Sequence, residues 1–201
     1  MKKITLLILM FVVSLGFSQE VMVLQDFENG GLGEPFGNLA SQMIVADPAD
    51  GGSRGMVAEL ITSAAGNVWQ GTNIELNQTV LLNDADQLTM IVDVYSTTAI
   101  SLAVKVVGSI DGGPDSTTSV DHAGNGWQSL IATFNTGQDG SGVANGTYAG
   151  FVVYPNWDPT TDTFINPAIE RTVYIDNIAG FVGAEPEPDA EPATAAPSQP
   201  A

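Results

Sequence analysis

The 201-residue chain contains no cysteine. Without a thiol it cannot form disulfide bonds, use a thiolate nucleophile or bind zinc through cysteine. A domain without such cross-links must be held together by its own apolar core or by a bound metal ion.

Basic residues are almost as scarce. Lysine and arginine total 5 against 23 acidic residues, which gives a formal net charge of −18 at pH 7. After residue 3, the basic side chains are Arg54, Lys105 and Arg171. A surface this acidic repels nucleic acid and anionic membranes, so neither is expected as a partner, and neutral ligands are favoured. The acidity is explained either by solubility, for example in a saline habitat, which we favour, or by binding of divalent cations.

Residues suited to catalysis are also few. The single histidine, His122, lies in a predicted surface loop, where a solvated role is favoured over a base or a ligand. The chain has no G-x-S-x-G nucleophile elbow and no phosphate- or dinucleotide-binding glycine pattern. A glycosidase needs only two suitably spaced carboxylates, but no predicted strand carries several on one face. A catalytic role is therefore the least favoured.

Long apolar runs are limited to residues 4–17, which follow Met1-Lys-Lys3. The small residues Gly16 and Ser18 then precede Gln19, as in a secretory signal peptide cleaved after Ser18. The run is too short for a comfortable membrane span. We therefore predict a signal peptide at residues 1–18 and a secreted protein, extracellular or at the cell surface, without membrane insertion.

The other end of the chain, residues 184–201, is rich in proline, alanine and acidic residues and lacks core-forming side chains. Such a composition predicts an extended, disordered linker or tail. Linkers of this kind tether domains. We favour the N-terminal part of a larger protein, with a possible C-terminal catalytic domain, over a terminal spacer.

Helix signals are nearly absent between these ends. Short runs of β-forming residues recur instead, separated by Gly, Asn, Asp and Pro. The predicted strands are residues 21–27, 39–45, 56–61, 68–76, 87–95, 100–110, 127–134, 150–154 and 172–181. Such a succession over residues 19–183 predicts an all-β domain, a two-sheet antiparallel β-sandwich of the jelly-roll type.

The clearest alternation of apolar and polar residues lies in the middle of the chain. In residues 88–94 every second position carries an apolar side chain, so these side chains lie on one face of a strand. Residues 100–106 repeat the pattern. The short connection 96–99 predicts that these two runs pair as a hairpin.

Carboxylates interrupt the first and last predicted strands. Asp176 lies within an apolar run, where a carboxylate is costly to desolvate without a cation or hydrogen-bond donors. Asp26 and Glu28 are two residues apart and so project from the same face of a strand. If these strands lie side by side, the three carboxylates are candidate ligands for a structural Ca²⁺. The alternative is that Asp26 caps a turn, Glu28 is solvated and Asp176 accepts backbone hydrogen bonds.

The three tryptophans are the best candidates for ligand contact, because sugar C–H groups stack on aromatic faces. Trp157 lies in a predicted loop with proline on both sides, and we favour a ligand role. Trp69 follows a polar turn and suits a core role or a ligand role equally. Trp127 opens an alternating strand, which favours packing. Tyr95, Lys105 and Arg171 are candidate hydrogen-bonding residues for sugar hydroxyls.

Several short segments, in this order, resemble the jelly-roll carbohydrate-binding modules of secreted bacterial polysaccharide-degrading proteins, above all laminarinase-associated modules of marine flavobacteria. They are Asp26-Phe-Glu28, Trp69-Gln-Gly-Thr-Asn-Ile74, Val94-Tyr-Ser96, Trp127-Gln-Ser-Leu130 and Val173-Tyr-Ile-Asp-Asn-Ile178. The resemblance covers about residues 21–183. It implies a non-catalytic module with a glycan site on a concave sheet face or in loops at one edge. It also implies a structural calcium, which falls here on Glu28 and Asp176, with Asp26 as a further candidate.

Three functions are therefore considered. The favoured one is a monomeric, secreted module that binds a neutral polysaccharide, for example a β-glucan such as laminarin, by aromatic stacking. The second is a structural or adhesive spacer without a glycan site, and the third is a glycoside hydrolase or lyase.

Overall fold

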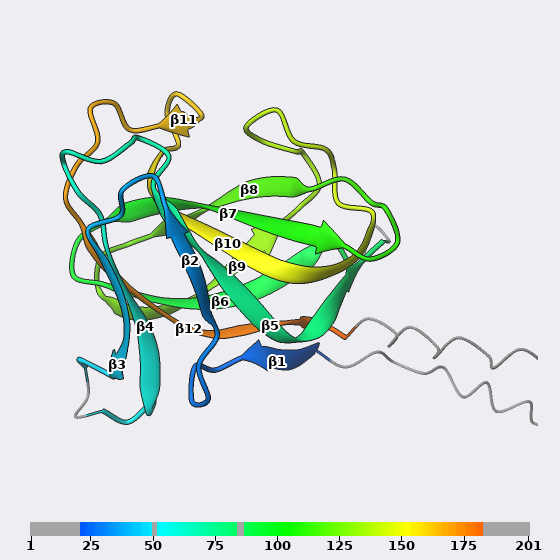
Figure 1. Ribbon diagram of the computed structural model, residues 1–201, viewed down its shortest axis with the longest axis horizontal. Coiled ribbons are helices and arrows are strands. Elements are labelled where there is room, and N and C mark those ends of the chain that lie inside the picture. Colours follow the sequence, from blue (N-terminus) through cyan, green and yellow to red (C-terminus); the bar gives the residue numbers. More distant parts are fainter. Residues whose placement is uncertain (1–20, 50–51, 84–86, 183–201) are drawn as a thin grey trace, which may run out of the picture.

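The computed structural model describes residues 21–49, 52–83 and 87–182, which form two antiparallel β-sheets packed face to face (Figure 1). Sheet A has the strand order β3-β4-β12-β6-β9, with β1 paired to β12. Sheet B has the order β2-β5-β10-β7-β8, with β11 paired to β10. This confirms the predicted all-β sandwich. The predicted signal peptide and the predicted tail lie outside the described residues.

The strands of sheet A are β1 (Val21–Gln25), β3 (Ser41–Ala46), β4 (Met56–Ile61), β6 (Thr89–Ser96), β9 (Gly126–Thr133) and β12 (Thr172–Phe181). Those of sheet B are β2 (Leu32–Phe36), β5 (Gly71–Leu82), β7 (Ile100–Ser109), β8 (Ser116–His122), β10 (Gly146–Asp158) and β11 (Thr163–Phe164). In these ranges no helix is long and apolar enough to cross a membrane.

Three strands were not predicted. Strand β2 reads Leu-Gly-Glu-Pro-Phe, and its proline is tolerated because β2 lies at an edge of sheet B. Strand β8 reads Ser-Thr-Thr-Ser-Val-Asp-His, whose polar residues conceal the alternation. Strand β11 has only two residues and is formed by its pairing with β10.

The predicted hairpin between residues 88–94 and 100–106 is wrong, although both apolar faces are buried as predicted. Strand β6 lies in sheet A between β12 and β9, whereas β7 lies in sheet B between β10 and β8. The apolar face of β6 therefore packs across the core against the apolar face of β7, which includes Leu102. The two faces are not neighbours within one sheet. Period-two alternation identifies the buried face of a strand, but two such strands can belong to opposite sheets of a sandwich.

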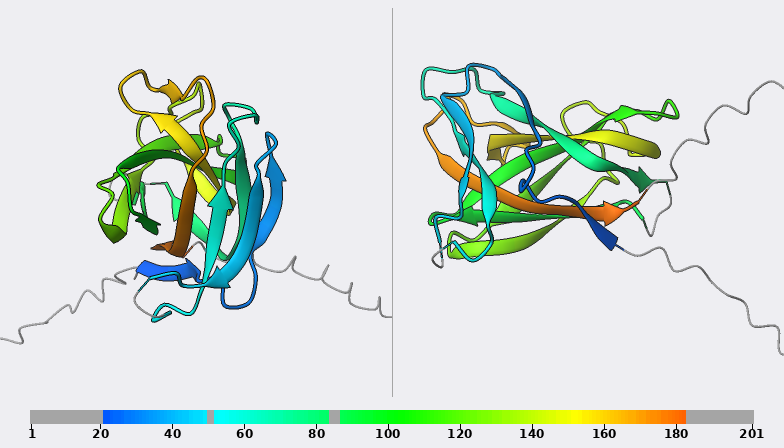
Figure 2. Two further views of the ribbon diagram at one scale, coloured as in Figure 1. Left: turned by 90° about the vertical axis from the view of Figure 1, so that its left-hand side faces the viewer. Right: turned by 60° about the horizontal axis from the view of Figure 1, so that its bottom comes forward.

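The first and last strands do lie side by side. Strand β1 pairs with the C-terminal half of β12, from Val21 opposite Phe181 to Gln25 opposite Ile178 (Figure 2). The N-terminal half of β12 pairs with β4, and its other edge pairs with β6. The register with β6 shifts between Asp176 and Ala179, where Asn177 has a left-handed backbone with φ of 42°. Asparagine tolerates this conformation better than most residues.

The core fills the space between the sheets. It includes Phe151 and Val153 from β10, Leu102 from β7 and Ile175 from β12, which are all fully buried. Because alternate residues of β10 point to opposite faces, its partly buried Tyr154 lies on the outer face of sheet B.

We predict that Phe151→Ala lowers the free energy of unfolding by about 3–5 kcal/mol, because it leaves a cavity between the sheets. Ile131→Ala is the control, since Ile131 is 66% exposed on β9 and its change should stay within about 0.5 kcal/mol. Urea denaturation of both variants measures the difference. Equal midpoints for the two variants would contradict this packing.

Candidate functional site

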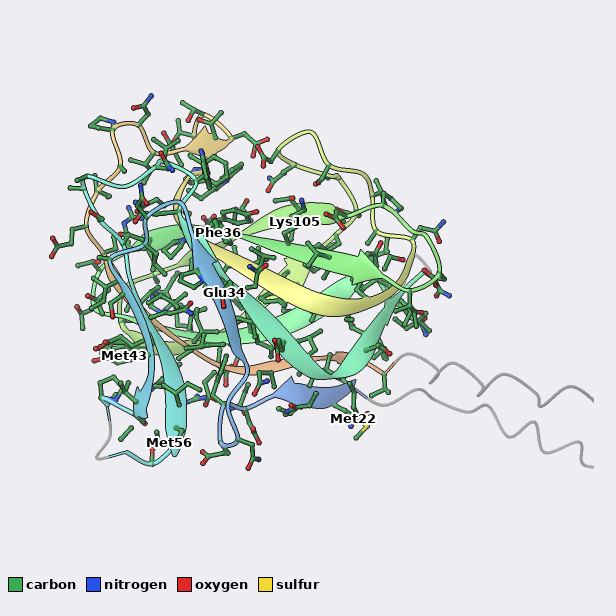
Figure 3. All side chains as sticks on the ribbon, viewed as in Figure 1. Met22, Glu34, Phe36, Met43, Met56 and Lys105 are labelled. Atoms are coloured by element: carbon green, nitrogen blue, oxygen red, sulfur yellow. The ribbon has the colours of Figure 1, made fainter. Side chains whose placement is uncertain are left out.

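Aromatic side chains gather over one edge of sheet B. Phe36 lies at the end of β2 nearer β11 (Figure 3), and it pairs with Gly71 at the start of β5. A side chain at position 71 would place its Cβ 2.9 Å from Cζ of Phe36 and 2.3 Å from the Val153 carbonyl oxygen. Glycine is therefore required for the Phe36 ring to lie over this strand.

Trp69 is presented by the turn that precedes β5. The adjacent Gln70 is fully buried, and its side-chain amide donates to the carbonyl oxygens of Ser63 (2.8 Å) and Asn67 (3.1 Å). Its Oε1 accepts from the Ser63 amide at 2.6 Å. These bonds fix the turn from within, so Trp69 is held in place although it is 46% exposed. A ring held in this way loses little conformational entropy when it binds a ligand.

The rings form a continuous surface from Trp69 to Phe164. Trp69 and Phe36 are stacked with centroids 6.2 Å apart and an interplanar angle of 20°. Phe36 then contacts Tyr154 at 5.3 Å, and Tyr154 contacts Phe164 of β11 at 5.4 Å. Together with Asp139, these four aromatic residues line a cavity of about 430 Å³, which we call the Trp69 cavity. Pockets for small ligands commonly have such a volume and such a lining.

The charge around the Trp69 cavity is negative. Burial raises the pKa of the Tyr154 hydroxyl, and the nearby carboxylates of Asp139 and Asp115 raise it further. Tyr154 therefore remains a neutral hydrogen-bonding group at physiological pH. Asp115 in turn forms an ion pair with Lys105 of β7, with 3.2 Å between the charged atoms. An anionic ligand would meet unfavourable carboxylate charge here.

The structure distributes the predicted glycan-binding residues over three places. Trp69 lines the Trp69 cavity, and Lys105 lies on β7 of the same sheet (Figure 3). Tyr95 lies in sheet A, where its ring contacts Trp127 at 5.5 Å and Tyr174 at 5.8 Å. The other two, Arg171 and Trp157, line a different cavity near the start of β12.

The prediction that Trp157 lies in a loop is wrong. Trp157 belongs to β10, is 1% exposed, and packs edge to face against Phe164 with centroids 5.1 Å apart. The flanking prolines suggested a loop, but β10 continues through Pro155 and pairs with β11. A ring this buried offers no open face for stacking on a sugar.

Sequence reasoning missed Phe36, Tyr154, Phe164 and Asp139. Tyr154 could have been found, because it alternates with the buried Phe151 and Val153 and so must face outward. Phe36 and Phe164 come from two of the unpredicted strands, and Asp139 comes from a loop. Their convergence depends on tertiary structure.

The polar face of sheet A accounts for the carboxylate in β12. Asp176 is 1% exposed, and its Oδ2 lies 3.4 Å from Nη1 of Arg54. The same Nη1 is 2.6 Å from Oδ2 of Asp93 on β6. Asn177, at the irregularity in β12, donates to Oδ2 of Asp93 (3.2 Å) and of Asp176 (3.1 Å). One guanidinium and one amide thus hold two buried carboxylates together.

Arg54 also fixes the connection between β3 and β4. Its guanidinium lies 4.4 Å above the Trp127 ring, a cation–π contact. The indole N–H of Trp127 donates to Asp47 at 3.1 Å, and Asp47 also accepts from the Arg54 amide at 3.3 Å. Trp127 therefore has the packing role that its strand position favoured.

The residues predicted to bind calcium do not fit a calcium site. Asp26 accepts from the amide of Glu28 at 3.2 Å, as in a capped turn, and Glu28 accepts from the amide of Met56 at 2.8 Å. Asp176 faces Arg54 instead of these two carboxylates. Across the described ranges no group of three or more His, Asp or Glu side chains is arranged to hold a metal ion. The countercharge for Asp176 is therefore a guanidinium.

Comparison with known proteins gives the fold. No protein-family model and no curated protein sequence matches the chain. Among solved structures, the family 11 carbohydrate-binding module of Clostridium thermocellum, in complex with a β-1,3-1,4-mixed-linked tetrasaccharide, superposes with a TM-score of 0.52 at 17% identity. The match covers 82% of this chain and 97% of that module. This chain shares the fold of that module.

Two further structures agree. The family 11 module of a cellulosomal cellulase of the same organism gives a TM-score of 0.51 at 19% identity, over 84% of this chain and 98% of that one. An exo-β-agarase gives a TM-score of 0.53 at 17% identity, and the match covers 83% of this chain and 25% of the enzyme. This domain thus resembles whole binding modules and one part of a larger enzyme.

We predict that Arg54→Met destabilises the protein by about 3 kcal/mol or more, because it leaves Asp93 and Asp176 without their cation. Lys105→Met is the matched control. It also removes one cation, but from a more exposed ion pair, and should cost less than about 1 kcal/mol. Thermal melting compares the two variants, and equal losses would show that the Arg54 pair contributes no more than a surface pair.

Asp176 should also affect how stability varies with pH. Burial raises its pKa above the ordinary value of 3.8, against the opposing effect of hydrogen bonds from Asn177 and Arg54. Between pH 3.8 and the raised pKa, the folded protein therefore binds a proton that the unfolded chain does not. We expect the wild-type protein to gain stability relative to Asp176→Asn as the pH falls through this window. A stability difference that does not vary with pH would contradict the raised pKa.

Proposed function

We propose that residues 21–182 form a carbohydrate-binding module that holds a neutral polysaccharide, for example a β-glucan such as laminarin, in the Trp69 cavity. The observation that carries the proposal is the exposed Trp69 ring, fixed by Gln70 and stacked on Phe36 at the cavity. Sugar C–H groups stack on such a face. The hydroxyl of Tyr154 and the carboxylate of Asp139 are suited to bind the sugar's hydroxyl groups.

The charge of the site supports a neutral glycan over an acidic one. Asp139 lines the cavity, and Asp115 is close enough to affect Tyr154. A uronic-acid polymer such as alginate would bring further carboxylates to this region. The shared fold supports a binding role, because one neighbour was solved with a mixed-linked β-glucan tetrasaccharide.

The sequence at the two ends extends the proposal. The leader at residues 1–18 supports export, and the acidic, proline-rich segment 184–201 supports attachment to a further domain. In that setting the module would keep a linked catalytic domain close to its polysaccharide and raise the local substrate concentration.

We predict that laminarin or mixed-linkage glucan in a native gel retards the protein, whereas alginate does not. Trp69→Ala should raise the Kd obtained from the retardation at least about tenfold, because it removes a central aromatic anchor. Xylan and agarose gels define the range of neutral glycans bound.

Ile131→Ala is the control, since it truncates an exposed apolar side chain in the other sheet and should migrate as the wild-type protein does. Unchanged mobility in every gel would favour a spacer domain. Retardation that survives Trp69→Ala would place the glycan elsewhere. Release of reducing sugar from the same glycans would instead indicate an enzyme.

A further inference from the structure

A second cavity, of about 540 Å³, lies next to the Trp69 cavity. Its apolar lining includes Ile100 at the start of β7, Trp157 near the end of β10 and Ile165 after β11. Its polar lining includes Ser101, Asp121 and Arg171. We call it the Arg171 cavity.

The hairpin formed by β10 and β11 separates the two cavities. Phe164 lines the Trp69 cavity, whereas its neighbour Ile165 lines the Arg171 cavity. Trp157 contacts Phe164 edge to face, so these two rings form the shared wall. Strand β11 lies above the labelled part of the other strands of sheet B (Figure 1). A chain of sugars bound on one side of the hairpin would lie close to its other side.

Arg171 is an unusual cation in this protein. Arg54 and Lys105 each form an ion pair with a carboxylate, but none is found for Arg171 among residues 21–49, 52–83 and 87–182. Its Nη1 donates to the Pro155 carbonyl oxygen at 3.0 Å, which holds the guanidinium at the cavity. Its backbone is fixed as well, because its amide donates to Oγ1 of Thr62 at 2.8 Å. The remaining N–H groups are therefore positioned donors without a carboxylate partner.

The charged acceptors that line this cavity are the carboxylates of Asp121 and Asp158. Asp121 of β8 accepts a hydrogen bond from the hydroxyl of Ser101 on the adjacent strand. Asp158 accepts from the amide of Thr160 at 2.9 Å and from the hydroxyl of Thr161 at 2.9 Å. A carboxylate has more acceptor sites than these bonds occupy.

This combination suits a neutral ligand with many hydroxyl groups. An anion would meet two carboxylates against one guanidinium. A purely apolar ligand would leave unused the hydrogen-bonding positions of all three groups that Pro155, Ser101, Thr160 and Thr161 do not occupy. Sugar hydroxyls can accept from Arg171 and donate to Asp121 and Asp158, while the C–H groups of the sugar lie against the partly buried Ile165. The volume is within the range of sites for small ligands.

We propose that the Arg171 cavity is a second glycan site, so that the module binds neutral sugar on both sides of the β10–β11 hairpin. This site is separate from the Trp69 cavity and does not require that cavity to bind. If both sites engage one polysaccharide, the second contact becomes intramolecular and the combined affinity exceeds that of either site.

The three tryptophans allow the sites to be observed separately by the ¹⁵N–¹H signals of their indole groups. Trp69 reports on the first cavity, Trp157 on the second, and Trp127 in sheet A is an internal control. The probes are laminaritetraose and the β-1,3-1,4-mixed-linked tetrasaccharide. We expect the Trp157 signal to shift and saturate with a Kd of its own, and the Trp127 signal to stay in place.

Substitutions then assign the shift. Arg171→Met should raise the Kd reported by Trp157 at least about tenfold and leave that of Trp69 unchanged, while Trp69→Ala should leave the Trp157 shift in place. Asp121→Asn, which keeps an oxygen acceptor for Ser101, should weaken the same site if Arg171→Met does not fold. Ile131→Ala, on the outer face of sheet A and away from both cavities, is the control and should leave both Kd values unchanged.

The proposal is overturned if the Trp157 signal does not move with either probe, or if its shift disappears with Trp69→Ala. It is also overturned if neither Arg171→Met nor Asp121→Asn changes the Kd that Trp157 reports. A shift at Trp157 with a silent Trp69 would instead refute the Trp69 cavity as a glycan site and leave this second site standing.

Discussion

One guanidinium, that of Arg54, organises sheet A. It lies between the carboxylates of Asp93 and Asp176, on neighbouring strands, and over the ring of Trp127. Burial by itself would lower the pKa of Arg54, but hydrogen bonds and charge interactions with the two carboxylates raise it, so Arg54 stays charged. A chain with a net charge of −18 can bury acidic groups only where a cation or donors compensate them. The pairing of the central strands β6 and β12 depends on Arg54, because this pairing places Asp93 opposite Asp176.

The two sheets consequently have different outer faces. In sheet A, Tyr95 packs between Trp127 and Tyr174, and burial together with the Glu59 carboxylate raises the pKa of Tyr174 to about 12. These aromatic residues are engaged with one another and with charged neighbours. At sheet B, Trp69 is instead 46% exposed and lines the Trp69 cavity together with Phe36. The same residue types thus pack against one another on one sheet and line an open cavity at the other.

The sequence predicts the fold better than the site. Burial of apolar side chains depends on local alternation, so the sandwich could be predicted from residues such as Val92, Val94 and Ile175. Alternation does not tell which strands pair, and the pairing of β1 with β12 entered only as a condition of the calcium hypothesis. The countercharge of Asp176 could not, because Arg54 is 122 positions away in the chain. Likewise, Trp69 can be recognised as a candidate, but its partners Phe36 and Phe164 come from strands with little β signal of their own.

The connection between β6 and β7, which replaces the predicted hairpin, also explains how the Arg171 cavity forms. If residues 96–99 had joined two neighbouring strands, they would form a turn at the end of one sheet. Instead they connect β6 of sheet A to β7 of sheet B, and the crossing places Ile100 beside the end of β10 and the residues before β12. In a jelly roll such crossings bring side chains from both sheets together at the end of the sandwich. That is why Arg171, which leads into sheet A, shares a cavity with Ser101 and Asp121 of sheet B.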